Sequence, residues 1–395
     1  MPKPLAVLAP AAALLCLVLA GCRKQEKLIK IATQTPLSGS VSAIGVDIKN
    51  GAQLAFEQLG GPLTQMGFKL GFAPFDDQGN PDTGVANAKA IGADKAILAV
   101  VGHIQSGVQI PSSEEYHAAG LANVSPGNTN PRVTDRGYPE ISRICGRDDV
   151  QGAVGAQFAK SKGIRTAYVL HDKTSYGQGV AEFFKKECEA QGIQVLGFAG
   201  TEEKSNFDAI LSPVLAARPD CLYAGQIFDQ ASVLIKQARQ KGFKGMFLAP
   251  DAFDATESAK IAGHALLEGG GTYYTTVSGP ASVYQGTAKF IADFKNKFGA
   301  PPQPFAAQGY DACAVAMKAI ENAAKAAGGK VPTRAAVVQA VRELKDFQGI
   351  TGTFNFNGKG DLVMGRYFII QVISDDPGKW SDNRIDKILD VPPPV

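Results

Sequence analysis

The stretch AILAVVGHIQSGVQIPSSEEYHAAGLANVSPGNTNP, residues 96–131, contains two short apolar runs that each end abruptly in small polar residues. The first run, 97–101, has the continuous apolar character of a strand buried on both faces of a parallel sheet, and a helical stretch begins near Val108. The second run, 121–124, ends in the loop SPGNTNP, 125–131. A strand, a helix and a second strand in this order are typical of an α/β fold with a parallel sheet.

The polar loops after the two runs are predicted to form part of one ligand site, because ligands of open α/β sheets bind just beyond the carboxyl ends of the strands. Ser106 lies at a predicted helix N-terminus, where free N–H groups and the helix dipole favour a carboxylate or another anion. Gly127 allows close approach of the backbone, and Thr129 adds a hydroxyl. Taken singly, Ser106 can be a helix cap and Thr129 a turn residue, and spacing alone favours these structural roles over ligand binding.

The same alternation continues on both sides of this stretch. Strands are predicted at 28–33, 68–75, 166–171, 193–198, 221–224 and 246–249, and helices at 46–59, 82–92, 150–162, 178–191, 206–217 and 229–241. Residues 132–149 look irregular between the two series. After Tyr284 the chain is mostly helical, and strand-like segments return at 352–356 and 362–372. Two similar α/β lobes with a late return of the chain indicate a clamp.

Composition and motifs exclude several classes of protein. The chain has 395 residues and is 45% hydrophobic, which fits two globular domains. Its formal net charge is +3 without a basic run, so no nucleic-acid partner is expected. The sequence lacks a G-x-S-x-G elbow, an H-E-x-x-H motif, a P-loop and a dinucleotide fingerprint after its first strand. The adjacent acids Asp76 and Asp77 would point to opposite faces of a strand and are a poor catalytic pair.

The cysteines and histidines do not indicate a metal site or a cofactor. Cys145, Cys188, Cys221 and Cys313 have no C-x-x-C spacing, so zinc binding and dithiol chemistry are not expected. In an exported protein two of them can still form a disulfide, for example Cys188 with Cys221, and the sequence leaves this open. The four histidines are isolated from one another and are predicted to be structural or exposed.

The N-terminus, residues 1–21, is predicted to be an export signal. Lys3 precedes an apolar run, 5–20, that is too short to span a bilayer comfortably. The sequence Leu-Ala-Gly-Cys, 19–22, resembles a bacterial lipobox, which implies cleavage before Cys22 and lipidation of its thiol. Residues 22–27 would form a short tether, so the protein is expected outside the cytoplasm, anchored to a membrane by its lipid. The alternative is an ordinary secretory signal with an incidental cysteine.

Seven further segments carry a resemblance to a known family: ATQTPLSG at 32–39, Asp76-Asp77 with Pro81, VVGH at 100–103, SPGNTNP at 125–131, HDKTSYGQG at 171–179, LYAGQ at 222–226 and APD at 249–251. In this order they resemble the amino-acid-binding proteins of branched-chain amino acid ABC importers, which are type I periplasmic binding proteins. The resemblance covers nearly the whole mature chain. It implies two Rossmann-like, doubly wound α/β lobes joined by a three-strand hinge, with residues 28–147 plus 278–353 in the first lobe and 148–277 plus 354–395 in the second.

The resemblance also implies roles for individual residues. Ser106, with N–H groups near it and near Tyr176, would bind the ligand carboxylate. Thr129, the carbonyl of Gly127 and the carboxylate of Asp251 would bind its ammonium. A zwitterion needs donors at one end and acceptors with a negative charge at the other, so this division is also chemically reasonable. Without the resemblance, Asp251 would be interpreted as a turn or helix cap.

The chain departs from the family at several of these positions. Relatives often carry Glu in place of Asp251, Tyr in place of Gln226 and an aromatic residue in place of Ile44. Two positions that form a disulfide in some relatives are Gly79 and Gln105 here, so both halves of that bridge are missing. Ile44, Ile104 and Phe228 are expected to contact the ligand through apolar groups, and Gln105 and Gln226 through polar ones.

The expected ligand is leucine, isoleucine or valine, with alanine and other neutral amino acids next. The expected partners are the permease subunits of an ABC importer, the protein itself being a monomer without cofactor or catalytic residues. One alternative is a binding protein or sensor of the same fold for an amide, urea or another small carboxylate, which Asp251 disfavours because it calls for a cationic group. A third alternative is an exported α/β enzyme.

Overall fold

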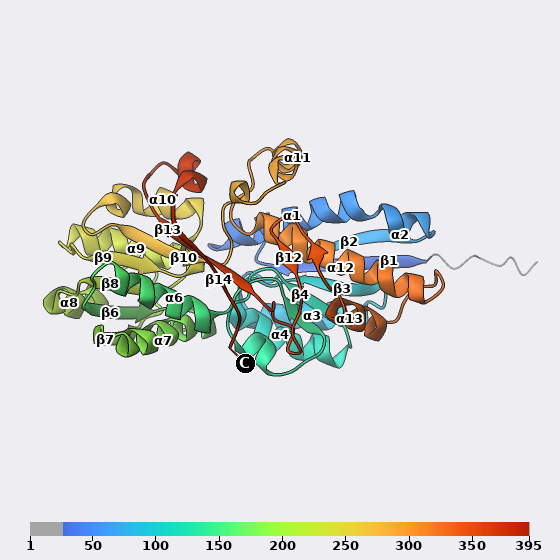
Figure 1. The fold of residues 1–395 in the computed structure, drawn as a ribbon, viewed down its shortest axis with the longest axis horizontal. Coiled ribbons are helices and arrows are strands. Elements are labelled where there is room, and N and C mark those ends of the chain that lie inside the picture. Colours follow the sequence, from blue (N-terminus) through green and yellow to red (C-terminus); the bar gives the residue numbers. More distant parts are fainter. Residues whose placement is uncertain (1–26, 395) are drawn as a thin grey trace, which may run out of the picture.

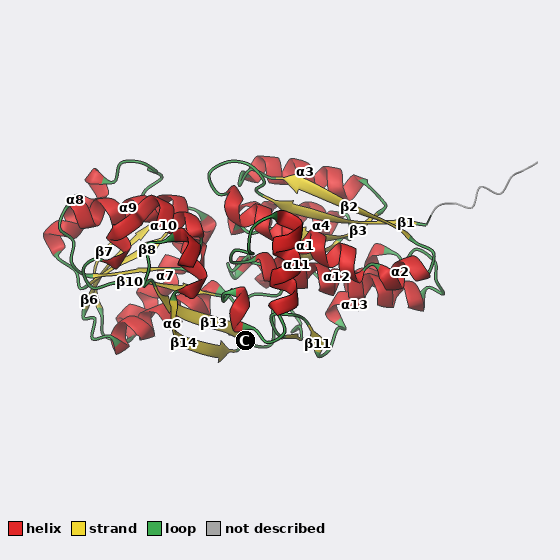
Figure 2. Ribbon diagram, turned by 90° about the horizontal axis from the view of Figure 1, so that it is seen from above, coloured by secondary structure: helices red, strands yellow, loops and turns green. Residues whose placement is uncertain are grey.

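The chain forms two α/β lobes that lie end to end in the computed structural model, which describes residues 27–394 (Figure 1). The predicted signal segment and the predicted lipidation site, Cys22, lie outside the described residues. Each lobe is built on its own sheet, with helices on both faces of the sheet (Figure 2).

The first lobe contains a five-stranded sheet in the order β2-β1-β3-β4-β5, and all its strand pairs are parallel. Its strands are β1 (Leu28–Thr35), β2 (Lys69–Asp76), β3 (Ile97–Gly102), β4 (Ala122–Ser125) and β5 (Ile141–Arg143). Its helices are α1 (Ser42–Leu59), α2 (Gly61–Gln65), α3 (Pro81–Ala93), α4 (Ser106–Ala118), α5 (Arg132–Asp135), α11 (Ala288–Phe298), α12 (Ala306–Ala326) and α13 (Arg334–Arg342). The parallel sheet predicted from the two apolar runs is confirmed, and β3 is buried along its whole length.

The apolar side chains of this sheet form one core on each face. On one face Ile31, Leu98 and Val101 pack against α1, α12 and α13, and on the other Ala32 and Val100 pack against α3 and α4. Two helices far apart in sequence, α1 and α12, therefore lie side by side, as the blue and orange ribbons of Figure 1 show.

The second lobe contains a seven-stranded sheet in the order β14-β13-β10-β9-β8-β6-β7. The parallel strands are β6 (Thr166–His171), β7 (Gln194–Gly200), β8 (Cys221–Gly225), β9 (Met246–Ala249) and β10 (Thr272–Thr276), whereas β13 (Gly365–Gln371) and β14 (Arg384–Val391) are antiparallel. The helices are α6 (Asp148–Ser161), α7 (Ser175–Ala190), α8 (Asp208–Ala217), α9 (Phe228–Gln240) and α10 (Thr256–Ala262). A small hairpin, β11 (Phe347–Gln348) with β12 (Thr353–Phe354), and four short 3-10 segments, η1 (Asp251–Phe253), η2 (Gly263–Leu267), η3 (Ala281–Val283) and η4 (Pro377–Asp382), complete the described chain.

The chain passes between the two sheets three times: after β5, after β10 and after β12. Three connections of this kind leave a cleft between the lobes and allow them to move about a common axis, which is the arrangement expected of a clamp.

The structure contains several elements that the sequence analysis did not predict. Residues 132–149 are not irregular throughout, because α5 and the short strand β5 lie there. Strands β10 and β14 and helix α10 were also not predicted. The strand β14, RIDKILDV, carries four charged residues, and β5 ends in a charged residue, so neither shows the apolar run of a buried strand.

Candidate ligand-binding site

A cavity of about 340 Å³ lies between the lobes. This volume falls at the lower end of the range found for small-molecule sites. The first lobe contributes Val41, Ile44, Gly79, Pro81, Ile104, Gln105, Gly107, Val108, Gly127 and Phe305, and the second contributes Lys173, Thr174, Ser175, Tyr176, Ile227, Asp251 and Ala252.

Six of the nine predicted site residues line this cavity, and the other three lie just behind its wall. The lining residues are Ile44, Ile104, Gln105, Gly127, Tyr176 and Asp251. Ser106, Thr129 and Gln226 are fully buried. The loops after β3, β4, β6, β8 and β9 all contribute residues at or next to the cavity, so the carboxyl ends of these parallel strands meet at one place, and the ligand site predicted there stays a prediction.

Two helix N-termini, one from each lobe, lie at the cavity. Helix α4 begins at Ser106, two residues before the predicted start, and its neighbours Gln105 and Gly107 line the cavity. Helix α7 begins at Ser175 and presents Ser175 and Tyr176 from the opposite side. The first-turn N–H groups of a helix have no intrahelical acceptors, so two such termini form a site for an anion such as a carboxylate.

Ser106 is more than a local cap. Its hydroxyl oxygen accepts a hydrogen bond of 3.3 Å from the backbone N–H of Asn130, in the loop after β4, and it makes no side-chain cap at α4. The two polar loops on which the fold prediction rested are thus joined directly. Because this bond uses the oxygen as acceptor, the hydroxyl hydrogen remains available as a donor.

Asp251 lies in the second lobe at the start of η1, directly after β9 and Pro250. Its carboxylate accepts a hydrogen bond of 2.8 Å from the Tyr176 hydroxyl, which in turn accepts one from the N–H of Ala252. Burial raises the pKa of Asp251 to about 6, although the hydrogen bond from Tyr176 opposes the rise. Backbone N–H groups at the start of η1 also lower the pKa of this carboxyl, so a local turn role and a ligand role are both compatible with its position.

The sequence analysis missed a second buried acid at this site, Asp148. It is the first residue of α6, and its backbone N–H donates to the carbonyl of Thr129 over 2.9 Å. Burial raises its pKa well above the usual range and the nearby charge of Asp251 raises it further, whereas the Thr129 hydroxyl opposes the rise. Neither carboxylate oxygen has a well-formed hydrogen bond within residues 27–394. In the sequence, Asp148-Asp149 looks like an ordinary acidic helix start, which hides its position.

The apolar wall differs from the prediction at one residue. Phe228 does not line the cavity: it begins α9 and packs in the core of the second lobe, and the preceding residue, Ile227, takes its place at the wall. Gln226 is fully buried behind the wall, and neither its amide oxygen nor its amide nitrogen has a hydrogen-bond partner in the described chain.

The lobes touch each other around the cavity. The Ser40 hydroxyl in the first lobe donates to Asp229 of the second over 2.8 Å, and the Asn130 amide donates to the carbonyl of Ser175. Gly79 and Gln105 are also adjacent, since a Cβ added to Gly79 would lie 2.5 Å from the Gln105 amide oxygen. The two positions that the family resemblance assigned to a lost disulfide are therefore in contact.

Within residues 27–394 the cysteines form neither a disulfide nor part of a metal-binding group. The sequence left a disulfide open, and the structure shows none among these four, which are all buried and free: Cys145, Cys188, Cys221 and Cys313. No group of three or more metal-binding side chains occurs within residues 27–394. Among the helices described, none has the length and apolar character needed to cross a membrane.

Comparison with known proteins gives consistent results. The family described as periplasmic binding protein matches residues 28–377. A Leu/Ile/Val-binding protein homologue from Brucella abortus is 32% identical over 349 residues, covering 88% of this chain and 91% of its own. A leucine-, isoleucine-, valine-, threonine- and alanine-binding protein from Pseudomonas aeruginosa is 33% identical, covering 85% of this chain and 87% of its own. The crystal structure of a leucine-binding protein from Thermotoga maritima superposes with a TM-score of 0.82 at 28% identity and covers 92% of this chain and 99% of its own.

Proposed function

Because the chain belongs to the Leu/Ile/Val-binding proteins, the type I periplasmic binding proteins of branched-chain amino acid ABC transporters, we propose that it captures a neutral branched-chain amino acid between its lobes and delivers it to an ABC permease. The family consists of solute-binding proteins rather than enzymes. We propose that the protein binds leucine, isoleucine and valine in preference to other amino acids. Threonine and alanine come next, by analogy with the Pseudomonas relative.

One observation carries this proposal: the same cavity is lined by residues of two helix N-termini, which favour an anion, and by a buried acid, which suits a cation. Residues at the N-termini of α4 and α7 line the cavity together with Asp251, and the buried acid Asp148 lies near Asp251. An α-amino acid carries its carboxylate and its ammonium on one carbon, so it suits a site with both features. Ile44, Ile104 and Ile227 offer an aliphatic surface to its side chain.

The size of the cavity supports a small ligand without a charged side chain. In the role we propose, Ser106 and the N–H groups of α4 and α7 bind the carboxylate. Gly127, Thr129 and Asp251 bind the ammonium, and Ile44, Ile104, Gln105 and Gln226 determine which side chain fits. Urea and amides carry no cationic group. With such a ligand Asp251 would be a buried charge without a partner, which is costly.

Thermal unfolding of the mature protein with and without amino acids tests the ligand class. Ligand at one hundred times its dissociation constant should stabilise the fold by about 2.7 kcal/mol, which raises the melting temperature by several degrees. Leucine, isoleucine and valine should do so, while urea and acetamide should not. If only the amides, or none of the neutral amino acids at millimolar concentration, raise the melting temperature, the proposal is wrong.

We also propose that Cys22 is lipidated and anchors the mature protein outside the cytoplasm, with the lobes 28–147 plus 278–353 and 148–277 plus 354–395 closing about the three connections. The support is the sequence Leu19-Ala20-Gly21-Cys22 at the end of an export signal. Several acyl chains hold a protein on a membrane where one does not. Wild type should therefore sediment with membranes and Cys22→Ser should not, and equal solubility of the two would contradict the anchor.

A further inference from the structure

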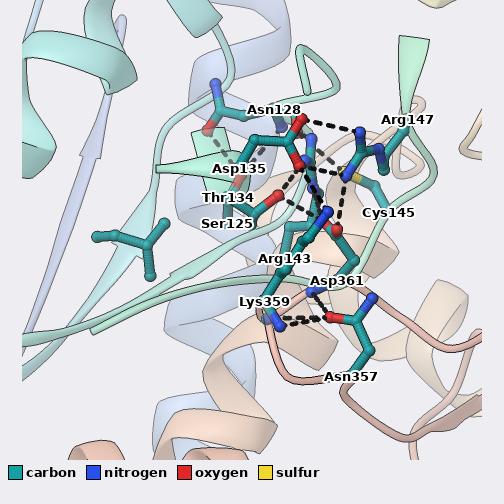
Figure 3. A network of polar contacts seen from close by, with 12 residues as sticks. Ser125, Asn128, Thr134, Asp135, Arg143, Cys145, Arg147, Asn357, Lys359 and Asp361 are labelled. Atoms are coloured by element: carbon teal, nitrogen blue, oxygen red, sulfur yellow. Dashed lines mark hydrogen bonds and ion pairs between the residues drawn. The ribbon is translucent and has the colours of Figure 1, made fainter. Parts of the chain in front are cut away.

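A buried cluster of charged residues lies where the chain leaves the first lobe, and we call it the hinge cluster: Thr134, Asp135, Arg143, Arg147 and Asp361 (Figure 3). Arg143 ends β5, immediately before the first connection between the lobes. Asp361 lies shortly before β13, on the approach to the last connection. The cluster therefore joins segments that are more than two hundred residues apart in sequence.

Arg143 uses its whole guanidinium group within this cluster. Its side chain is completely buried, and its Nε donates to Asp361 over 2.6 Å. Its Nη1 donates to the backbone carbonyls of Asn128 and Asn130 over 2.9 and 3.0 Å, and its Nη2 donates to the Thr134 hydroxyl. Burial would raise the pKa of Asp361, but Arg143 and Thr134 hold it below its ordinary value, so the pair is charged.

The two carbonyls that Arg143 holds lie on either side of Thr129. They belong to the loop that places Gly127 in the cavity wall and the Thr129 hydroxyl beside Asp148, and Gly127 and Thr129 are two of the residues proposed above to bind the ammonium. A backbone carbonyl that accepts a short bond from a planar, fixed donor has a fixed peptide orientation. With the peptides at 128 and 130 both fixed, the direction of Thr129 between them is also fixed.

We propose that Arg143 is a positioning residue for ligand binding: held by Asp361, it orients the loop 127–130 so that its acceptors point at the ligand ammonium. The proposal rests on the function proposed above, and it adds a residue that neither touches the ligand nor lines the cavity. Through Asp361, the orientation of the binding loop is also linked to the last connection between the lobes.

Arg147 provides a matched control within the same cluster. It shares Asp361 with Arg143 through a contact of 2.8 Å, and it also pairs with Asp135 and Asp149. Its side chain is nearly buried, like that of Arg143. Among the hydrogen bonds of residues 27–394, however, Arg147 donates none to a carbonyl of the loop 127–130. A substitution of Arg147 therefore disturbs the hinge cluster without removing a side-chain bond to the loop, whereas a substitution of Arg143 does both.

The test compares Arg143→Lys with Arg147→Lys by calorimetry, using leucine and its 2-hydroxy analogue, which lacks the ammonium. Both variants should melt at a lower temperature. Arg143→Lys should weaken leucine binding about tenfold, the scale found for residues that act through a neighbour, and change binding of the hydroxy analogue less than about threefold. Arg147→Lys should leave the ratio of the two affinities unchanged. Equal losses for both ligands in Arg143→Lys, or equal changes of the ratio in both variants, would overturn the proposal.

If Arg143→Lys does not fold, Thr134→Val answers the same question, because it keeps both charges and removes only the hydroxyl that holds Nη2. A smaller change of the affinity ratio in the same direction is expected from it, and an unchanged ratio would count against the proposal.

Hydrogen exchange without ligand separates the failure of this proposal from the failure of the proposed function. The amides of Asn128 and Asn130 donate to Ser125 and Ser106, and they should exchange faster in Arg143→Lys but not in Arg147→Lys. If wild type binds no branched-chain amino acid, the function is wrong while this measurement still decides the role of Arg143. Unchanged exchange in Arg143→Lys overturns the positioning role whatever the ligand is.

Discussion

Asp251 is the residue on which the ligand class depends, and its environment explains why the sequence alone was ambiguous. An Asp after a strand and a proline usually caps the next turn. Only the structure shows that the carboxylate also accepts from the Tyr176 hydroxyl inside the cavity wall. Asp148 was missed for the same reason, since its burial depends on how α6 packs beneath Thr129 and not on any local pattern.

Replacing Asp251 with Asn should strongly weaken amino-acid binding. The change keeps the shape and removes the charge that faces the ammonium. Truncating one partner of a buried charge pair typically costs roughly 2–5 kcal/mol, which is about one and a half to four orders of magnitude in affinity. Calorimetry with leucine measures the loss, and the 2-hydroxy analogue of leucine should lose little further.

Asp254→Asn is the matched control for this variant. Asp254 is another buried acid three residues further on, but it accepts from the Trp380 indole N–H over 2.8 Å and does not line the cavity. Its replacement should leave leucine affinity nearly unchanged. Leucine binding by Asp251→Asn within about threefold of wild type, far below the expected range, would show that Asp251 does not bind the ammonium.

The buried acids also predict how stability depends on pH. Burial raises the pKa of Asp172, Asp251 and Asp311 to about 6 and that of Asp47 and Asp254 to about 7, from 3.8 in each case. Between about pH 4 and 7 the folded protein thus binds more protons than the unfolded chain, so the free energy of unfolding falls as pH rises. Acids whose pKa is lowered, such as Asp76, change the free energy of unfolding only below this window. Burial lowers the pKa of His171, so this single group opposes the trend near pH 6.

We therefore expect ligand-free protein to melt at a lower temperature at pH 8 than at pH 5. Leucine affinity should change in the opposite direction, rising with pH through about 6, because the charged form of Asp251 binds the ammonium. Melting curves without ligand and calorimetry with leucine across this range measure the two trends. A melting temperature that increases steadily from pH 5 to 8 would contradict the assignment of these acids as buried and protonated.

At the scale of elements, the sequence predicted most of the parallel α/β framework and failed at the pieces that complete each sheet. The central strands are apolar runs between polar loops, so β3 and β4 can be predicted without a structure. The edge strand β14 contains four charged residues without a regular alternation, and β5 has only three residues, one of them the buried Arg143. Such strands are determined by their partners in the sheet and by buried ion pairs, which a local pattern does not show.

The packing of α1 on α12 gives a prediction at this scale. A Cβ at Gly51 would lie 1.9 Å from the carbonyl oxygen of Ala306, and one at Gly309 would lie 2.4 Å from that of Ile48. Both clashes are with backbone atoms, so the helices must separate. Gly51→Ala should lower the free energy of unfolding by about 1–3 kcal/mol or more, as measured by denaturant unfolding.

Gly61→Ala is the control for this variant, because Gly61 begins α2 and a Cβ there would meet nothing within 4 Å. It should be neutral or slightly stabilising. Because Ile44 of α1 and Phe305 at the start of α12 both line the cavity, Gly51→Ala should also weaken leucine binding. Equal stabilities of Gly51→Ala and Gly61→Ala would mean that the two helices do not pack as closely as described.

At the scale of the whole molecule, both lobes line the cavity, so the proposed ligand site is complete only when the lobes are together. The two helix N-termini at the cavity come from different lobes, and Asp251, the acid that we propose to face the ammonium, lies in the lobe opposite Gly127 and Thr129. Ligand binding and closure are therefore coupled, and a ligand that bridges the lobes shifts the population toward the closed form. The sequence predicted two lobes and a cleft, but the contacts that hold the cleft shut join residues nearly two hundred positions apart and are visible only in the fold.

One of these contacts provides a test of closure through the rate of ligand release. The Ser40 hydroxyl donates to Asp229 across the cleft, a bond that is made only when the lobes are together, whereas the nearby Ser38 hydroxyl donates to Asp76 within its own lobe over 2.6 Å. A hydrogen bond of this kind contributes about 0.5–1.5 kcal/mol. Ser40→Ala should therefore release leucine about 2- to 12-fold faster in stopped-flow measurements, with the association rate nearly unchanged.

Ser38→Ala, in the same loop, should leave the release rate at its wild-type value, because its bond is present in the open and the closed form alike. If both serine variants release leucine at the same rate, the Ser40–Asp229 contact does not hold the lobes closed, and the closed form is maintained by the ligand alone.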